Sequence, residues 1–203
     1  MKVITFETGG EIAAGFIDGD EAVVCATGAQ ARKAVLGLIE GGDAARAQWQ
    51  ASTGPRVPLA SVRLMAPIPE PRRDILCVGK NYYAHAAEFH TSGFDSSGKE
   101  EVPSYPVVFT KAPATVCGPG DVVNGALDPT GSVDYEGELG VIIGKRCFKA
   151  SKAEAYDYVF GYVIINDVTS RELQKQHNQW IIGKSLDTFC PMGPWIATAD
   201  EVG

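Results

Sequence analysis

The sequence predicts an α+β protein that is rich in strands and begins with a small N-terminal α/β domain. Short β-prone runs flank Asp18-Gly19, a dipeptide that favours a tight hairpin. An amphipathic helical pattern follows over residues 31–39. Two further apolar β-prone runs occupy residues 139–144 and 158–165, and runs this apolar are typical of strands covered on both faces.

The bulk composition is that of an ordinary globular protein with a substantial core. The 203 residues are 45% hydrophobic and 21% charged. The formal net charge is −7 and no lysine- or arginine-rich tract occurs, so the electrostatic footprint of a nucleic-acid-binding protein is missing. No apolar run is long enough to predict a membrane span or a secretory signal. We therefore expect a cytoplasmic protein without nucleic-acid or membrane partners.

The chain is expected to divide near residue 70. In the first part, a helix with one buried stripe is predicted, and Gly41-Gly42 ends the first stretch of this helix. The stripe residues are Ala31, Ala34, Val35, Leu38 and Ile39. Five prolines between residues 55 and 71 then predict an extended connector. The second domain, 71–203, begins with a short strand and a helix from about Tyr82 to Phe89, and its polar segment 91–105 is a candidate lid.

Acidic residues flank the two apolar runs of the second domain. Glu136 and Glu138 open the first run, and the period-two geometry of a strand would put both carboxylates on one face. Asp167 directly follows the second run and supplies a third carboxylate. Such an all-oxygen set suits Mg²⁺, Mn²⁺ or Ca²⁺ rather than zinc. The alternative is a surface-exposed glutamate pair and an aspartate that caps a turn.

Three further groups are candidates for catalysis or substrate binding. His85 and Glu88 are three residues apart on the predicted helix and could form a general-base dyad, with a solvated helix face as the alternative. Arg171 and Gln174 have the same spacing and could hold an anionic substrate. Lys184, between small residues, could donate to a developing oxyanion, although a surface lysine is the default interpretation.

Four ordered segments of the sequence resemble motifs of the fumarylacetoacetate hydrolase family. They are GKNYYAHAAE at 79–88, DYEGEL at 134–139, INDVTSR at 165–171 and GKSLDTFCPMGP at 183–194. The resemblance covers about residues 67–203, and the N-terminal part looks like the small domain that many members carry. Four motifs in the family's order are more specific than any one of them.

The resemblance implies a β-rich roll of mixed sheets with flanking helices, usually paired as a homodimer. It also implies that Glu136, Glu138 and Asp167 bind Mg²⁺ or Mn²⁺, and that His85 with Glu88 activates water. The residues that would contact substrate or stabilise an oxyanion are Arg171, Gln174 and Lys184.

Three hypotheses about function follow. The leading one is a metal-dependent hydrolase that cleaves a carbon-carbon bond in a 2,4-dioxo acid of the acylpyruvate or fumarylpyruvate type. The second is decarboxylation of a 2-oxo diacid, or isomerisation of a hydroxymuconate-type compound, on the same metal site. The chain stops at Gly203, before the glycine/threonine-rich loop and last strands of the family's roll. The third hypothesis is therefore a non-catalytic fragment, unless a partner supplies the missing wall.

Overall fold

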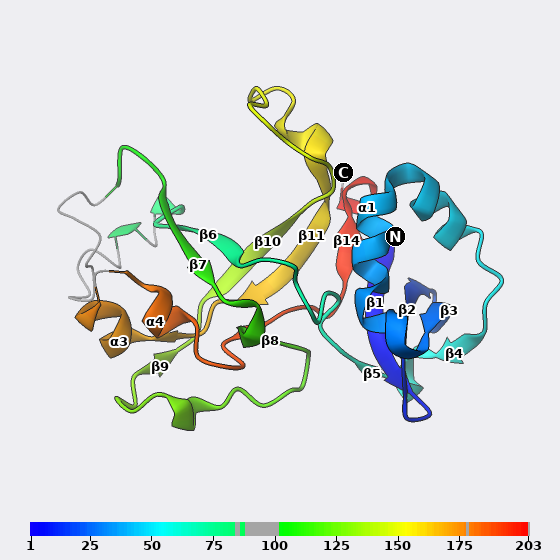
Figure 1. The fold of residues 1–203 in the computed structure, drawn as a ribbon, viewed down its shortest axis with the longest axis horizontal. Helices are drawn as coiled ribbons and strands as arrows, with labels where there is room; N and C mark the ends of the chain where they lie inside the picture. The colour runs from blue at the N-terminus through cyan, green and yellow to red at the C-terminus, as the bar shows by residue number, and fades with distance from the viewer. Residues whose placement is uncertain (84–85, 88–101, 178, 203) are drawn as a thin grey trace.

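The computed structural model describes residues 1–83, 86–87, 102–177 and 179–202 (Figure 1). The strands are β1 (Lys2–Thr8), β2 (Glu11–Asp18), β3 (Glu21–Thr27), β4 (Arg56–Pro58), β5 (Arg63–Leu64), β6 (Ile75–Gly79), β7 (Val107–Lys111), β8 (Val116–Cys117), β9 (Val133–Asp134), β10 (Gly137–Ile143), β11 (Val159–Asn166), β12 (Thr169–Ser170), β13 (Cys190–Pro191) and β14 (Ile196–Thr198). The α-helices are α1 (Ala31–Gln50), α3 (Arg171–Gln176), α4 (Ile181–Lys184) and α5 (Ala199–Val202). The predicted class, α+β and rich in strands, is confirmed.

The N-terminal part follows the sequence pattern closely. Strands β2 and β3 form the expected hairpin, and Gly19 turns the chain between them with φ of 59°. Helix α1 buries four of the five stripe residues, Ala31, Val35, Leu38 and Ile39. Gly42, with φ of 57° and ψ of −143°, kinks the helix where an end was expected, and helical residues continue beyond it to Gln50.

One sheet crosses the expected boundary near residue 70. Among the described residues this sheet has eight strands in the order β10-β11-β14-β1-β2-β3-β4, with β5 beside β1. Strand β14 pairs with β1 through Lys2↔Ala197 and Val3↔Ile196. The Met1 amine donates to Thr198 Oγ1 at 2.7 Å, and Figure 1 shows both ends of the chain close together. The N-terminal strand therefore lies between the hairpin and the C-terminal strand.

The main hydrophobic core follows from this pairing. It contains Val3 of β1, Leu38 of α1, Val163 of β11 and Ile196 of β14, all buried and packed in one cluster. These residues come from both sides of the expected boundary. Burial of such aliphatic side chains is the dominant favourable contribution to folding, so the two parts of the chain stabilise each other.

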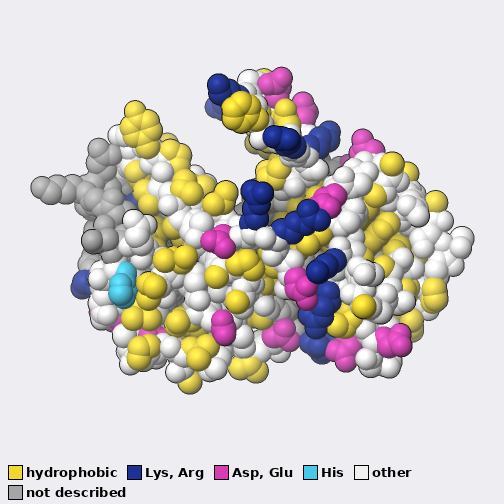
Figure 2. Space-filling model, viewed as in Figure 1, with side chains coloured by type: hydrophobic (Ala, Val, Ile, Leu, Met, Phe, Trp, Pro, Cys, Tyr) yellow, Lys and Arg dark blue, Asp and Glu magenta, His cyan; other side chains and the backbone are white. Residues whose placement is uncertain are grey.

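Strands β10 and β11 pair as an antiparallel hairpin, but only one face of this hairpin is covered. Leu139 lies opposite Ile164 in the register, and their side chains are 59% and 67% exposed. On the other face Val163 and Ile165 are buried. The expectation of strands covered on both faces is therefore wrong for these residues, because Leu139 and Ile164 on the outer face stay exposed. Figure 2 shows hydrophobic side chains exposed beside the hollow that separates this hairpin from the lobe with β6 and β7.

The described helices are short or amphipathic. None of them is long and apolar enough to cross a membrane. The longest, α1, is buried on one side only, which is typical of a helix that covers a sheet. It packs on β1, β2 and β3, so it covers the part of the main sheet that is formed by the N-terminal strands.

Candidate functional site

Most of the residues singled out in the sequence line one cavity. The cavity has a volume of about 720 Å³ and lies between the β6–β7 pair and β10. The predicted residues among its lining are Glu136, Glu138, Asp167, Gln174 and Lys184. His85 and Glu88 lie outside the described residues, as does most of the candidate lid, so the general-base dyad stays a prediction.

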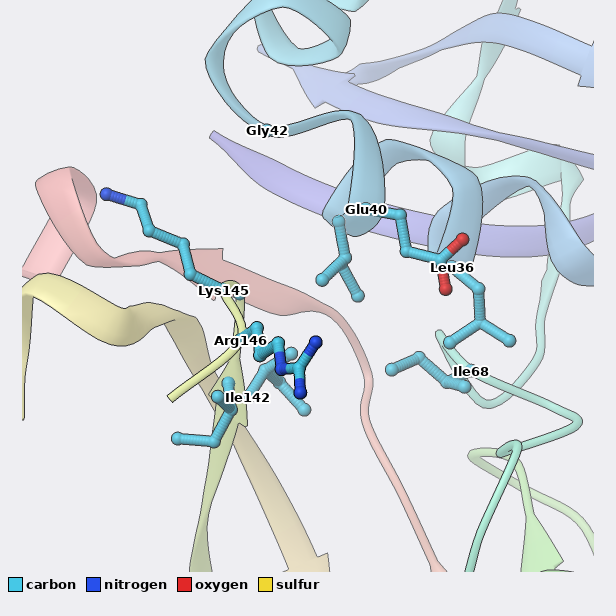
Figure 3. Close-up of a pocket in the computed structure, with 10 residues that line it drawn as sticks. Leu36, Glu40, Gly42, Ile68, Ile142, Lys145 and Arg146 are labelled. Atoms are coloured by element: carbon cyan, nitrogen blue, oxygen red, sulfur yellow. The ribbon is translucent and has the colours of Figure 1, made fainter. Parts of the chain in front are cut away.

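A second cavity, of about 550 Å³, adjoins the first but holds none of the predicted residues. It lies between α1 and the end of β10, and Figure 3 shows Leu36 and Glu40 of the helix facing Ile142 and Arg146. Its floor is aliphatic. Among the residues that the structure describes, no carboxylate, lysine or amide of the family motifs lines this second cavity, so the first cavity is the candidate active site.

The β10–β11 hairpin brings the acidic residues together. Asp167 N donates to Glu136 O at 2.8 Å, and Glu136 N donates to Asn166 Oδ1 at 3.1 Å, so the strand pairing continues past both strand ends. This fixes Glu136 beside Asp167, although the two residues are 31 positions apart in the chain. Glu138, two residues after Glu136, also lines this cavity.

Lys184 lies between two of these carboxylates. Its Nζ atom donates to Glu136 Oε2 at 2.7 Å and to Asp167 Oδ2 at 2.8 Å. It also lies 5.0 Å from the centre of the Phe109 ring, which packs edge-on against Trp180. The lysine is almost fully buried, so the surface alternative is excluded and its ammonium faces the candidate site.

A second buried lysine, Lys111, was missed in the sequence. Its side chain is 0% exposed, and its Nζ atom lies 2.7 Å from Asp167 Oδ1. The same atom donates to Val168 O at 3.1 Å and to Lys184 O. The sequence contains only a weak indication of this role, because Lys111 is the last residue of the apolar strand β7 and a lysine at the end of a strand is usually solvated.

Asp167 is buried between two ammonium groups, and only 4% of it is exposed. Burial would raise the pKa of this carboxyl, but the ammonium groups of Lys184 and Lys111 outweigh burial and hold the pKa below its usual range. The Oδ1 atom forms an ion pair with Lys111 Nζ at 2.7 Å, and no other described residue donates a hydrogen bond to it. A buried carboxylate oxygen in this state has an acceptor position left for a cation.

Arg171 faces acidic side chains. Its guanidinium binds Asp134 Oδ2 through Nε and Nη2 at 2.9 and 2.7 Å, and Glu136 Oε1 through Nη1 at 2.5 Å. Burial would lower the pKa of Arg171, but Glu136 and Asp134 raise it. Nη1 also donates to Gln174 Oε1 at 3.3 Å. Arg171 therefore orients Glu136 and Gln174 in this structure, and its direct contact with substrate stays a prediction.

The donor set of the cavity fits a hard divalent cation. Four carboxylates line it, those of Asp74, Glu136, Glu138 and Asp167, and the last three belong to the family motifs. The described residues contain no ready-made group of three acidic, histidine or cysteine side chains that would hold a metal. In this structure the ammonium of Lys184 lies between the carboxylates of Glu136 and Asp167. The assignment of Glu136, Glu138 and Asp167 as metal ligands stays a prediction that the chemistry of the donors supports.

Close packing of α3 against α4 sets the position of Lys184. A Cβ atom added to Gly183 would lie 2.5 Å from Gln174 N and 2.8 Å from Ser170 O, distances that force backbone to move. We expect Gly183→Ala to lower the free energy of unfolding by about 1–3 kcal/mol, because the two helices must separate. Urea unfolding measures this, with Gly37→Ala as control, since a Cβ at Gly37 of α1 meets nothing within 4 Å. A Gly183→Ala protein as stable as the wild type would contradict the close packing.

A buried aspartate organises the loop before β9. Asp128 accepts hydrogen bonds from the N–H and hydroxyl of Thr130 at 2.9 and 2.6 Å, and from the N–H of Ser132 at 2.7 Å. Burial would raise the pKa of Asp128, but these donors lower it to about 2. Ser132 Oγ in turn accepts from Glu172 N in the first turn of α3, so this loop supports the helix that carries Arg171.

Replacing Asp128 with asparagine is expected to lower the free energy of unfolding by on the order of 1–2 kcal/mol at neutral pH. The contribution of the carboxylate is full above its unfolded pKa of about 3.9. It is lost as the pH falls through the folded pKa of about 2. The difference in stability between wild type and variant should therefore narrow below about pH 4 in urea titrations. The exposed Asp20→Asn is the control, and a gap that stays constant down to pH 3 would contradict the prediction.

Comparisons with known proteins agree with this geometry. Residues 74–203 match the model of the fumarylacetoacetate (FAA) hydrolase C-terminal domain. Residues 1–67 match the Rv2993c-like N-terminal domain. The chain is 50% identical over 144 residues to the oxaloacetate tautomerase YisK of Bacillus subtilis, an alignment that covers 71% of this chain and 46% of that protein.

Solved structures share the fold. A fumarylacetoacetate hydrolase from the psychrophile Exiguobacterium antarcticum superposes with a TM-score of 0.76 at 38% identity, over 98% of this chain and 67% of that one. Maleylpyruvate hydrolase from Sphingobium sp. SYK-6, solved with manganese(II) and pyruvate, has a TM-score of 0.72 at 28% identity, over 98% and 68%.

The chain spans about half the length of the curated relatives it matches. Within that span, the family match covers all of the described residues that line the candidate active site, apart from Leu36, Ile68 and the residues 71–73. Members with related sequences and structures include hydrolases and a tautomerase. This protein belongs to the fumarylacetoacetate hydrolase family.

Proposed function

We propose that this protein is a metal-dependent enzyme that acts on 2-oxo acids, and that its reaction is hydrolysis of a carbon-carbon bond in an acylpyruvate-type 2,4-dioxo acid. The observation that carries the proposal is the meeting of Glu136, Asp167 and Lys184 at one buried end of the cavity. Carboxylates for a cation and an ammonium for an oxyanion are what this chemistry requires.

Glu136, Glu138 and Asp167 are the residues that would hold the cation. When bound, Mg²⁺ or Mn²⁺ would supply Lewis-acid polarisation of the substrate's 2-oxo group. The solved maleylpyruvate hydrolase with manganese(II) and pyruvate supports both the kind of metal and the kind of ligand.

The remaining steps depend on side chains of this chain. His85, oriented by Glu88, would remove a proton from water that attacks the distal carbonyl carbon. The Lys184 ammonium, with the Gln174 amide, would donate hydrogen bonds to the oxygen that becomes negative. Both residues are buried and line the cavity, so water competes little with them. Cleavage of the carbon-carbon bond then gives a carboxylic acid and the enol form of pyruvate, which takes up a proton.

A second candidate, keto–enol isomerisation of a 2-oxo diacid, is favoured by the 50% identity to an oxaloacetate tautomerase. The reaction uses the same acidic and cationic groups and needs proton transfer at carbon in place of attack by water. Decarboxylation of such a diacid would also proceed through an enolate. All three reactions share the recognition of a 2-oxo acid and differ in the fate of the enolate.

The experiment is an assay of the purified protein with Mg²⁺ or Mn²⁺ against an acylpyruvate, oxaloacetate and an unsaturated dioxo acid. Hydrolysis produces pyruvate and a carboxylic acid in equal amounts, decarboxylation produces CO₂, and isomerisation changes the ultraviolet spectrum without either product. Absence of metal-dependent turnover on all three substrates would contradict the proposal and favour the non-catalytic fragment. The homodimer that the family resemblance implies is checked by light scattering on the same sample.

A further inference from the structure

Among the residues that the structure describes, Lys111 is a fully buried charged side chain, 0% exposed, that the proposed reaction does not use. It ends β7, on the wall of the cavity opposite β10, and its ammonium makes three contacts. One is the ion pair with Asp167 Oδ1 at 2.7 Å. The other two are the carbonyl oxygens of Val168 and Lys184. All three lie far away in sequence, so Lys111 joins β7 to the end of β11 and to α4.

The two oxygens of Asp167 therefore have different partners. Oδ2 accepts a hydrogen bond from Lys184, whose ammonium is shared with Glu136. Oδ1 is paired with Lys111 alone among the described residues. A carboxylate held at both oxygens cannot rotate about its Cβ–Cγ bond without breaking an ion pair in a nearly water-free site, where such pairs are strong. The direction of the Asp167 side chain is thus fixed by two lysines on different elements.

We propose that Lys111 is a positioning residue, which fixes the carboxylate of Asp167 in the orientation that a divalent cation needs. The inference rests on the proposed function only in taking Asp167 as a metal ligand. Lys111 acts through Asp167 and through the main chain of Lys184, and it does not touch substrate. Partners of this kind, which orient a metal ligand, typically change metal affinity by about 10- to 100-fold when removed.

The sign of the effect separates positioning from simple electrostatics. Lys111 is a positive charge beside a cation site, so Coulomb repulsion alone predicts that its removal tightens cation binding. Positioning predicts the opposite, because a ligand that is free to rotate loses its alignment on binding. The two explanations therefore give changes of opposite direction in the same measurement.

The test measures Mn²⁺ binding to the full chain by electron paramagnetic resonance, without substrate. Lys111→Met and Lys111→Gln are expected to raise the dissociation constant for Mn²⁺ by about 10- to 100-fold. Two matched controls are expected to leave it within about twofold of the wild type. Ser185→Ala removes the hydrogen bond that Ala112 N donates to Ser185 Oγ, another contact between the ends of β7 and α4, without touching Asp167. Lys33→Met removes one positive charge from the exposed side of α1.

Several outcomes overturn the proposal. If both Lys111 variants bind Mn²⁺ as tightly as the wild type or more tightly, Lys111 acts on the cation only through its charge. If Ser185→Ala loses as much Mn²⁺ affinity as the Lys111 variants, the contact with α4 matters rather than the contact with Asp167. If neither Lys111 variant folds, a structure of the wild type with bound Mn²⁺ tests the proposal instead. An Asp167 carboxylate that points away from Lys111 in that structure would overturn the positioning role of Lys111. A wild type that binds no Mn²⁺ also overturns it, whereas Mn²⁺ binding without turnover of 2-oxo acids refutes only the proposed function.

Discussion

Lys184→Met is expected to lower turnover of a 2-oxo acid substrate by about 10²- to 10³-fold, because it removes a preorganised donor to the oxyanion. It should also lower the free energy of unfolding by about 3–5 kcal/mol without metal, since a buried carboxylate pair loses its shared cation. Lys184 Nζ bridges Glu136 Oε2 and Asp167 Oδ2 at 2.7 and 2.8 Å, so both carboxylates are affected at once. Steady-state kinetics and thermal unfolding measure the two effects.

Adding Mn²⁺ should restore the stability of the Lys184→Met variant but should not restore its turnover. A dication that neutralises the two carboxylates stabilises the folded state of the variant by linkage, so Mn²⁺ should raise its melting temperature more than that of the wild type. Lys33→Met is again the control for the change in net charge. A variant whose turnover stays near that of the wild type would refute the role of Lys184, and a variant that Mn²⁺ fails to stabilise would contradict the metal ligands.

His85→Ala is expected to lower turnover by about 10²- to 10⁴-fold, the usual contribution of a general base, while Mn²⁺ affinity stays unchanged. The reason is that, in the proposed function, the imidazole of His85 would act on water, whereas the metal would be held by the three carboxylates. Steady-state kinetics measured beside a Mn²⁺ titration separate the two effects.

His177→Ala is the matched control for this prediction, since His177 is an exposed histidine at the end of α3. It should leave both turnover and Mn²⁺ binding unchanged. Normal turnover in His85→Ala would remove the general-base assignment, and loss of Mn²⁺ binding in that variant would make His85 a metal ligand instead.

Local sequence patterns predicted the parts of the fold that depend on local geometry. The turn at Asp18-Gly19 and the stripe in α1 follow from the φ that glycine allows and from the period of 3.6 residues. The expectation that Glu136 and Glu138 share one face follows from the period of two, and both residues line the cavity. Each of these depends on residues within a few positions of one another, so a single sequence is sufficient.

The pairing of β1 with β14 was not predicted, because it joins residues 2–3 to residues 196–197. The hydrophobic periodicity of a segment does not indicate which distant strand will pair with the edge of a hairpin. The exposed outer face of β10 and β11 was mispredicted for the same reason: a run of apolar residues indicates that a face can be buried, and only the arrangement of other elements decides whether something covers it.

The sequence by itself determined the chemistry of the candidate site: three carboxylates, a lysine and an amide in the ordered motifs of one family. The tertiary structure alone decided how their charges are balanced. Lys111 reaches Val168 O across 57 positions and Lys184 O across 73, and Arg171 reaches Asp134 across 37. A charged side chain that folding buries needs polar partners close in space, so the partners of Lys111 and Arg171 are set by the packing of β7, β11, α3 and α4 rather than by spacing along the chain.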